Sequence, residues 1–132
     1  EEEVGAGEEE GIRGMVRAWG PVGRVGGRLM VAVGCVSGGS DAFVYMVIEA
    51  LADGGGKYGL TRKTAYEMAA QAVLGSAKMV LETGKHPGQL KDEVCSPGGT
   101  TIAGVSALEE GAFRSCVIRA ADACYEKSMK IK

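Results

Sequence analysis

The sequence lacks the motifs that would place it in a nucleotide-binding class. In GAGEEE, at 5–10, only the first two glycines of GxGxxG are present, and acidic residues stand where a phosphate would lie. DGGGKYG, at 53–59, has no glycine five residues before Gly56, and Tyr58 replaces the Ser or Thr that would hold magnesium. We interpret these later glycines as the weakened end of a helix.

Metal sites and activated nucleophiles also have little support. The chain has one histidine, His86, and its four cysteines form no CxxC and stand at no metal-site spacing from it. No serine or cysteine partner lies near His86 in sequence, so a catalytic triad has no basis. Free thiols are typical of a reducing compartment, which predicts a cytoplasmic protein, or a mitochondrial or plastid one in a eukaryote. The cysteines are Cys35, Cys95, Cys116 and Cys124.

Charge and hydropathy exclude two further classes. The net charge of −2, without a run of Lys and Arg, argues against a nucleic-acid partner. No apolar stretch is seen to reach the roughly 18 residues of a membrane span, so no membrane partner is expected. No signal-peptide pattern follows Glu1, and a chain that begins this way is expected to be a fragment. Its 132 residues, 45% of them hydrophobic, suffice for one globular domain.

What the sequence does contain is a series of helical patterns. After an acidic, glycine-rich tail at 1–11, a short helix is predicted at 12–19 and a short strand at 21–25. The apolar run at 26–39 fits a helix or a strand, because its periodicity does not separate the two. From residue 41 onward the patterns are helical, which makes the fold class all-α. These later helices are expected at 41–59, 60–84, 86–95, 100–111 and 112–132.

Capping residues mark the ends of the longest predicted helix, at 60–84. Thr61 can cap its start, or Thr64 and Glu67 can form a capping box one turn later. Gly84 follows its last turn as a stop.

Small residues on this helix indicate that a second chain helps to bury it. They let helix backbones approach closely, and a helix that is apolar or small on most faces is buried on most faces. One small domain offers few ways to surround such a helix. The small residues are Ala69, Ala70, Ala72, Gly75, Ser76 and Ala77. An apolar stripe on the last helix comprises Phe113, Cys116, Val117, Ala120, Cys124 and Ile131.

The most informative polar segment is CSPGGTT, at 95–101. Its two glycines permit backbone conformations closed to other residues, and its serine and two threonines supply hydroxyls. A helix that begins near Thr100 offers free N–H groups and the positive end of its dipole, which together suit a carboxylate or phosphate. The alternative is a plain turn with Thr100 as N-cap, and local chemistry alone favours it because caps are commoner than anion sites.

The residues around this turn carry a resemblance. HPGQLKDEVCSPGGTTIAGVSALEEGAFRS, at 86–115, closely resembles the C-terminal domain of pyrroline-5-carboxylate reductase, the last enzyme of proline biosynthesis. IEALADGGGKYGLTRKTAYEMAAQAVLGSAKMVLETGKHPG, at 48–88, is also similar to that family. The resemblance covers about residues 28–132, while residues 9–27 more weakly resemble the join from a preceding nucleotide-binding domain.

The resemblance implies an oxidoreductase, with a boundary between residues 27 and 28 where its helical domain begins. Residues 28–132 would form an interlaced all-α homodimer, a unit that often assembles into larger rings, and residues 1–27 a tail and join. The substrate, pyrroline-5-carboxylate, would lie between NADH or NADPH and the dimer's helices, and hydride transfer to its C=N carbon would give L-proline. Thr101 would lie near the ring nitrogen as the catalytic residue. The substrate carboxylate would contact Ser96, Gly98, Gly99, Thr100 and Thr101. The cofactor side would involve Ser37, Gly38 and Gly39.

Three departures from the family matter. SGGSDAF, at 37–43, stands where the family carries a segment like SGSGPAY, so Asp41 replaces a proline near the nicotinamide. A carboxylate at this position would repel an anionic substrate. The alternative is that Asp41 is simply the N-cap of the helix that follows. The family's acidic residue before the HPG step is missing, since Gly84 and Lys85 precede His86. The third departure is the missing Rossmann motif, so this chain alone is expected to bind no cofactor and to be inactive.

Two other functions stay open. A non-enzymatic oligomerisation module, as a truncated or degenerate relative, would explain SGGSDAF and the missing cofactor motif. A generic helical anion-binding protein would lack the selectivity for a small cyclic carboxylate that the reductase interpretation predicts.

Overall fold

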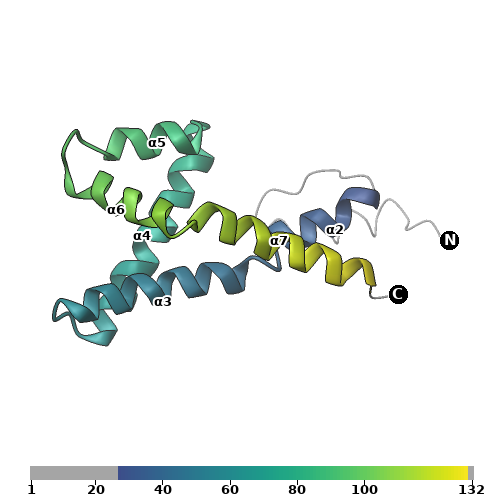
Figure 1. Cartoon of the computed structure of the whole chain (residues 1–132), viewed down its shortest axis with the longest axis horizontal. Coiled ribbons are helices and arrows are strands. Elements are labelled where there is room, and N and C mark those ends of the chain that lie inside the picture. The colour runs from purple at the N-terminus through teal and green to yellow at the C-terminus, as the bar shows by residue number, and fades with distance from the viewer. Residues whose placement is uncertain (1–26, 131–132) are drawn as a thin grey trace. The chain divides into compact units, whose positions relative to one another are not determined.

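A computed structural model of the chain describes residues 27–130, and all of their regular structure is helical (Figure 1). The helices are α2 (Gly27–Val36), α3 (Asp41–Lys57), α4 (Arg62–Thr83), α5 (Pro87–Val94), α6 (Thr100–Glu110) and α7 (Phe113–Lys130). The all-α class is therefore confirmed. The tail at 1–11, the helix at 12–19 and the strand at 21–25 lie outside the described residues. The chain divides between Met30 and Val31, and the unit that begins at Val31 is described by itself.

The apolar run at 26–39 forms a helix, α2, and ends in a tight turn at residues 37–40. Ser37 Oγ donates a hydrogen bond to the carbonyl of Val33 over 2.7 Å, and Ser40 Oγ donates to that of Val36 over 2.6 Å. These carbonyls belong to the last turn of α2, where a helix leaves its C=O groups without partners. The turn is thus held by the end of the helix that precedes it.

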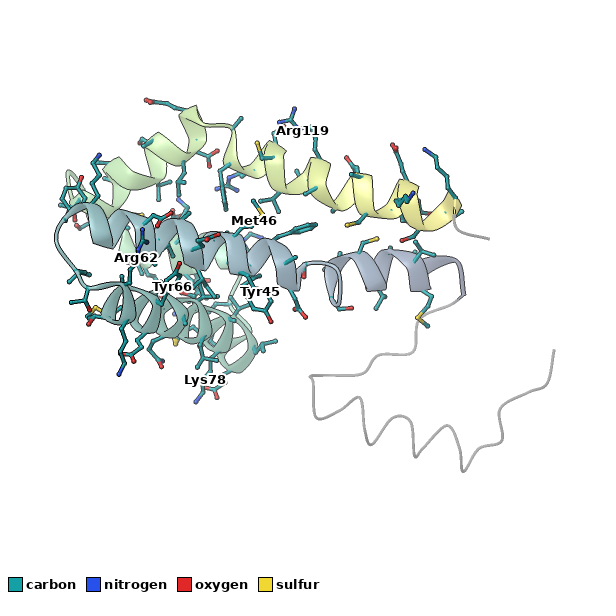
Figure 2. The ribbon with its side chains drawn as sticks, turned by 90° about the horizontal axis from the view of Figure 1, so that it is seen from below. Tyr45, Met46, Arg62, Tyr66, Lys78 and Arg119 are labelled. Atoms are coloured by element: carbon teal, nitrogen blue, oxygen red, sulfur yellow. The ribbon has the colours of Figure 1, made fainter. Side chains whose placement is uncertain are left out.

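Alanines join α3 and α4 into a closely packed hairpin. Ala52 of α3 is fully buried, and Ala65 and Ala69 of α4 are buried against it, with Ile48 partly buried beside them. Side chains this small let the two backbones approach closely. Across the connection Arg62 donates a hydrogen bond to Asp53, which raises the pKa of Arg62; Figure 2 shows Arg62 at this end of the hairpin.

The three glycines at 54–56 lie inside α3, which continues to Lys57. The left-handed turn comes later, at Gly59, where φ is 97°. A Cβ on Gly55 would lie 3.1 Å from Leu60 Cδ1 and 3.5 Å from Ala65 Cβ. The interpretation of the glycines as a helix end therefore missed a second role of Gly55, which leaves room for Leu60 and for Ala65 of α4.

Both ends of α4 follow capping rules. Thr61 Oγ1 accepts the N–H of Thr64 over 3.3 Å, so Thr61 is the N-cap and the capping box of Thr64 with Glu67 is wrong. Gly84 takes the left-handed conformation, with φ of 64°, and donates its N–H to the carbonyl of Val80. The predicted stop at Gly84 is confirmed.

The later helices begin and end close to the predicted residues. Pro87 is the first residue of α5, where its missing N–H leaves no bond unmade. The helix α6 ends before Gly111, but the left-handed residue is Ala112, with φ of 55°. The chain bends there, and α7 leads onward from the end of α6 (Figure 1).

A single chain buries very little of its apolar surface. Within residues 29–130 only Cys35, Ala52, Ala65 and Ala69 are buried. Large apolar side chains remain exposed to solvent. On α3, Tyr45 is 67% and Met46 68% exposed (Figure 2). On the predicted α7 stripe, Phe113 is 41% and Val117 43% exposed. Burial of one such side chain is worth about 1.5–3 kcal/mol, so a surface of this kind marks an interface.

One helical stretch, Leu29–Lys57, is long and apolar enough to cross a membrane when judged by length and composition alone. The expectation that no apolar stretch reaches that length is therefore wrong. The stretch comprises most of α2 and all of α3, and the turn at residues 37–40 separates them.

Candidate functional site

The segment that the sequence singles out forms a β-turn at residues 96–99, called here the Pro-Gly-Gly turn. The Gly99 N–H donates to the Ser96 carbonyl over 3.0 Å, which closes the turn. Pro97 occupies its second position, and Gly98, with φ of 67°, its third. Proline followed by a residue of positive φ is the sequence requirement of a type II turn, so the local chemistry of these residues dictates the shape.

The turn leads directly into α6 and leaves the start of that helix open. Gly99 is the N-cap, in an extended conformation and without a side-chain cap, so Thr100 is not the N-cap but the first helical residue. The N–H groups of Thr100, Thr101 and Ile102 are those that a helix start leaves without intrahelical partners. Together with the positive end of the helix dipole they suit an anion.

Ser96 and Gly99 are packed against each other across the turn. A Cβ on Gly99 would lie 2.3 Å from Ser96 Oγ and 3.0 Å from the Ser96 carbonyl oxygen. A side chain at Gly99 would displace the Ser96 hydroxyl and lie tightly against the Ser96 carbonyl oxygen. Within residues 27–130 the hydroxyls of Ser96, Thr100 and Thr101 are in no hydrogen bond, and the three residues are exposed. These hydroxyls are available to a bound molecule.

The helix α5 that precedes the turn is fixed at both ends by polar contacts. At its start His86 Nδ1 accepts the N–H of Gly88 over 3.0 Å, which makes His86 an N-cap. The side chain of Lys85 reaches along α5 to Glu93, with 2.8 and 3.0 Å between Nζ and the two carboxylate oxygens. This hydrogen bond, helped by one from Gln89, holds the pKa of Glu93 below its usual value. Sequence reasoning missed both contacts.

The predicted cofactor-side residues lie elsewhere in the same unit. Ser37, Gly38 and Gly39 form the turn between α2 and α3, and Figure 1 shows that junction well apart from the α5–α6 connection. Asp41 is the first residue of α3, while Ser40 is the N-cap, so the interpretation of Asp41 as N-cap is wrong by one residue. A proline would also be favoured at this first helical position.

The remaining motifs form no site in the part of the chain that is described. No group of three metal-ligating side chains occurs among residues 27–130. All four cysteines are free thiols. The glycines of 53–59 serve the α3–α4 hairpin, and His86 caps α5. An apolar cavity of about 370 Å³ lies between α4 and α5, with Met79, Val80, Leu90 and Val94 among its lining residues.

The fold and the turn define a class: a helical domain with a large exposed apolar surface and a glycine-rich turn that leaves the start of a helix uncapped. Comparison with known proteins gives the family. Residues 28–131 match the family described as "Pyrroline-5-carboxylate reductase dimerisation". The chain belongs to this family, which confirms the resemblance read from the sequence.

Two similar relatives of this chain are named pyrroline-5-carboxylate reductase. Pyrroline-5-carboxylate reductase of Escherichia coli is 62% identical over 96 residues, which are 73% of this chain and 36% of that protein. The Arabidopsis thaliana reductase is 46% identical over 130 residues, which are 97% of this chain and 47% of that protein. A crystal structure of the Plasmodium falciparum enzyme with NADP bound has a TM-score of 0.87 and 32% identity, and the match covers 97% of this chain and 52% of that one. The chain thus spans 36% and 47% of the length of these two curated relatives.

Proposed function

We propose that the chain is the substrate-binding and dimerisation half of a pyrroline-5-carboxylate reductase, which reduces 1-pyrroline-5-carboxylate to L-proline with NADPH or NADH. The observation that carries the proposal is the Pro-Gly-Gly turn, which opens the N-terminus of α6 and leaves three hydroxyls available. The setting is cytoplasmic, or mitochondrial or plastid in a eukaryote, as expected for free thiols.

In this proposal the substrate's carboxylate accepts hydrogen bonds from the start of α6. The N–H groups of Thr100 and Thr101 and the hydroxyls of Ser96 and Thr100 are the donors, with Gly98 and Gly99 giving the turn its shape. The carboxylate and the ring are one rigid unit, so fixing the first orients the C=N bond. Thr101, one residue further along, donates its hydroxyl to the ring nitrogen. A dinucleotide bound beside the ring would supply the hydride that the C=N carbon receives, and a proton from solvent would complete the amine at the ring nitrogen.

The residues on the cofactor side fit only a limited role. The Ser37 hydroxyl is already donated to Val33, so it can act toward a nicotinamide carboxamide only as an acceptor. A Cβ on Gly39 would lie 3.3 Å from the carbonyls of Gly34 and Cys35, which keeps that position compact. We infer that the rest of the dinucleotide is bound by residues outside this chain, and that this chain alone binds none and is inactive.

The exposed apolar side chains of α3 and α7 indicate what kind of partner the chain binds. We propose that a second copy covers the exposed faces of α3 and α7, in preference to lipid, and that such dimers can assemble into rings. Because the α2–α3 junction and the Pro-Gly-Gly turn lie apart in one chain, the second copy would bring one beside the other. Light scattering at micromolar concentration is expected to give twice the chain mass, and a monomer would contradict the proposal.

The proposed function is tested by titration with L-proline, the product, followed by NMR. We expect shifts of the N–H signals at residues 98–102, and an affinity for L-proline about three- to tenfold weaker in Thr101→Ala, since one hydrogen bond is lost. Ser106→Ala is the control, because the Ser106 side chain lies more than one turn beyond the Thr100 and Thr101 groups that the proposal uses, and its Oγ donates only to the Ile102 carbonyl. Equal responses to acetate and L-proline would favour a generic anion site.

A non-enzymatic oligomerisation module is the second candidate, and Asp41 is the observation that favours it. An exposed carboxylate at the start of α3 would oppose an anionic substrate if it faced the site. Asp41→Pro should then strengthen binding of L-proline. Absence of L-proline binding in both forms would support the second candidate.

A further inference from the structure

The helix α5 sets the position of the Pro-Gly-Gly turn, and its own stability is not obvious. It has eight residues, fewer than an isolated helix needs to persist in water. Its packing against α4 is incomplete, because an apolar cavity of about 370 Å³ separates parts of the two helices. Polar contacts must therefore supply part of what holds α5 in place.

Most of these polar contacts are made by one carboxylate, that of Glu93. Glu93, in the last turn of α5, accepts three hydrogen bonds: two from Lys85 Nζ, at 2.8 and 3.0 Å, and one from Gln89 Nε2, at 3.0 Å. Lys85 lies before the first turn, so the contact runs the length of the helix. Lys85 and Glu93 are 41% and 45% exposed, less than the 64% of both members of the Lys78–Glu82 pair on α4. Figure 2 shows Lys78 projecting outward from the helices.

The end of α5 passes this constraint on to the turn. The Cys95 N–H donates to the carbonyls of both Lys91 and Asp92 over 3.1 Å, so the residue before the turn is still held by α5. Ser96 follows directly, and its carbonyl closes the turn with Gly99. Glu93 and Ser96 are only three residues apart, so a shift of the last turn of α5 would also move the Ser96 hydroxyl.

We propose that Glu93 is a positioning residue of the substrate site, which through Lys85 and Gln89 holds α5 so that the Pro-Gly-Gly turn receives the substrate's carboxylate. The inference rests on the proposed function of that turn. Glu93 touches no substrate and takes no part in the reduction. It sets the affinity for the carboxylate and leaves hydride transfer unchanged.

The test uses two substitutions that change the local charge in opposite directions. Glu93→Gln removes a negative charge and Lys85→Met a positive one, so an effect through the electrostatic field would strengthen binding of L-proline in the first and weaken it in the second. Loss of the contact weakens it in both, by about two- to fivefold for a partly exposed pair. The double exchange Lys85→Glu with Glu93→Lys restores the pair and should recover the affinity.

Glu82→Gln is the matched control, because it removes the carboxylate of an exposed lysine pair on α4. It should leave the affinity for L-proline unchanged. Opposite signs for Glu93→Gln and Lys85→Met, or unchanged affinity in both, would overturn the inference and leave the proposed function standing. If the original chain itself binds no L-proline, the carboxylate site fails and the inference fails with it. Faster hydrogen exchange in α5 without a change in affinity would show a structural role only and would also overturn it.

Discussion

The α3–α4 hairpin and the α5–α6 connection are built on different principles. Among residues 29–130 the hairpin holds three of the four buried side chains, and these three are alanines. Its Gly55 lies close to Leu60 and Ala65. The α5–α6 connection has no buried side chain, and its shape comes from a turn, two caps and an ion pair. The hairpin is thus specified by contacts between helices, and the connection by contacts between neighbours in sequence.

The difference separates scaffold from site. A region fixed by close packing tolerates no added volume, whereas a region fixed by backbone conformation and hydrogen bonds leaves polar groups open to a ligand. Substitutions in the first should change stability, and substitutions in the second should change binding.

The largest effect is expected when volume is added to the hairpin. Ala52→Leu places three more carbons where the side chain is fully buried between α3 and α4, and overpacking of this kind costs about 1–3 kcal/mol. Urea unfolding would measure it. Ala107→Leu, the same change at an exposed position on α6, is the control and should change the unfolding free energy by less than about 0.5 kcal/mol. Equal costs at the two positions would contradict the packing described.

A smaller effect is expected when a methyl group is added at the turn. Gly98 has φ of 67° and open space around it, so Gly98→Ala costs only backbone strain, about 1–2 kcal/mol. Gly104→Ala, inside α6 with nothing within 4 Å in the same chain, should instead stabilise the helix by about 1 kcal/mol. The two unfolding curves would move in opposite directions. Destabilisation by Gly104→Ala would place the second copy against α6.

The smallest effect concerns pH at the α5–α6 connection. The Lys85 hydrogen bond holds the pKa of Glu93 below its usual 4.5, so the folded state favours the carboxylate. The contribution of Glu93 to stability is complete above the pKa of the unfolded chain and is lost as the pH falls through the lower folded value. The difference in Tm between the original chain and Glu93→Gln should shrink as the pH falls from about 7 through the lowered pKa of Glu93. A constant difference would show that the ion pair contributes nothing.

Sequence rules predicted the parts of the fold that depend on neighbours along the chain. Thr61, Gly84 and Pro87 each mark a helix end by their own backbone or side-chain chemistry, and the structure places them there. The predicted helix at 41–59 already included the glycines at 54–56, but the close approach of Leu60 and Ala65 to Gly55 was not predictable, because only the tertiary structure creates it. The helix α2 was not separable from a strand, since a short apolar run carries both periods.

For the site, the two glycines and the proline predicted the turn, because each residue restricts φ by itself. The identity of the N-cap was missed by one residue, since Gly99 takes the extended conformation that Thr100 was assigned. The contacts of Glu93 with Lys85 were missed because a lysine eight residues away is recognised as a partner only after α5 has formed. The roles of individual residues toward substrate and cofactor stay predictions.

The scarcity of buried side chains has a consequence for how stability is measured. When most apolar surface is covered only on association, unfolding and dissociation are one equilibrium, and its midpoint depends on mass action. The Tm should rise with each tenfold increase in chain concentration, and any free energy assigned to one residue holds only at a stated concentration. For this domain, a higher chain concentration should itself raise the measured stability.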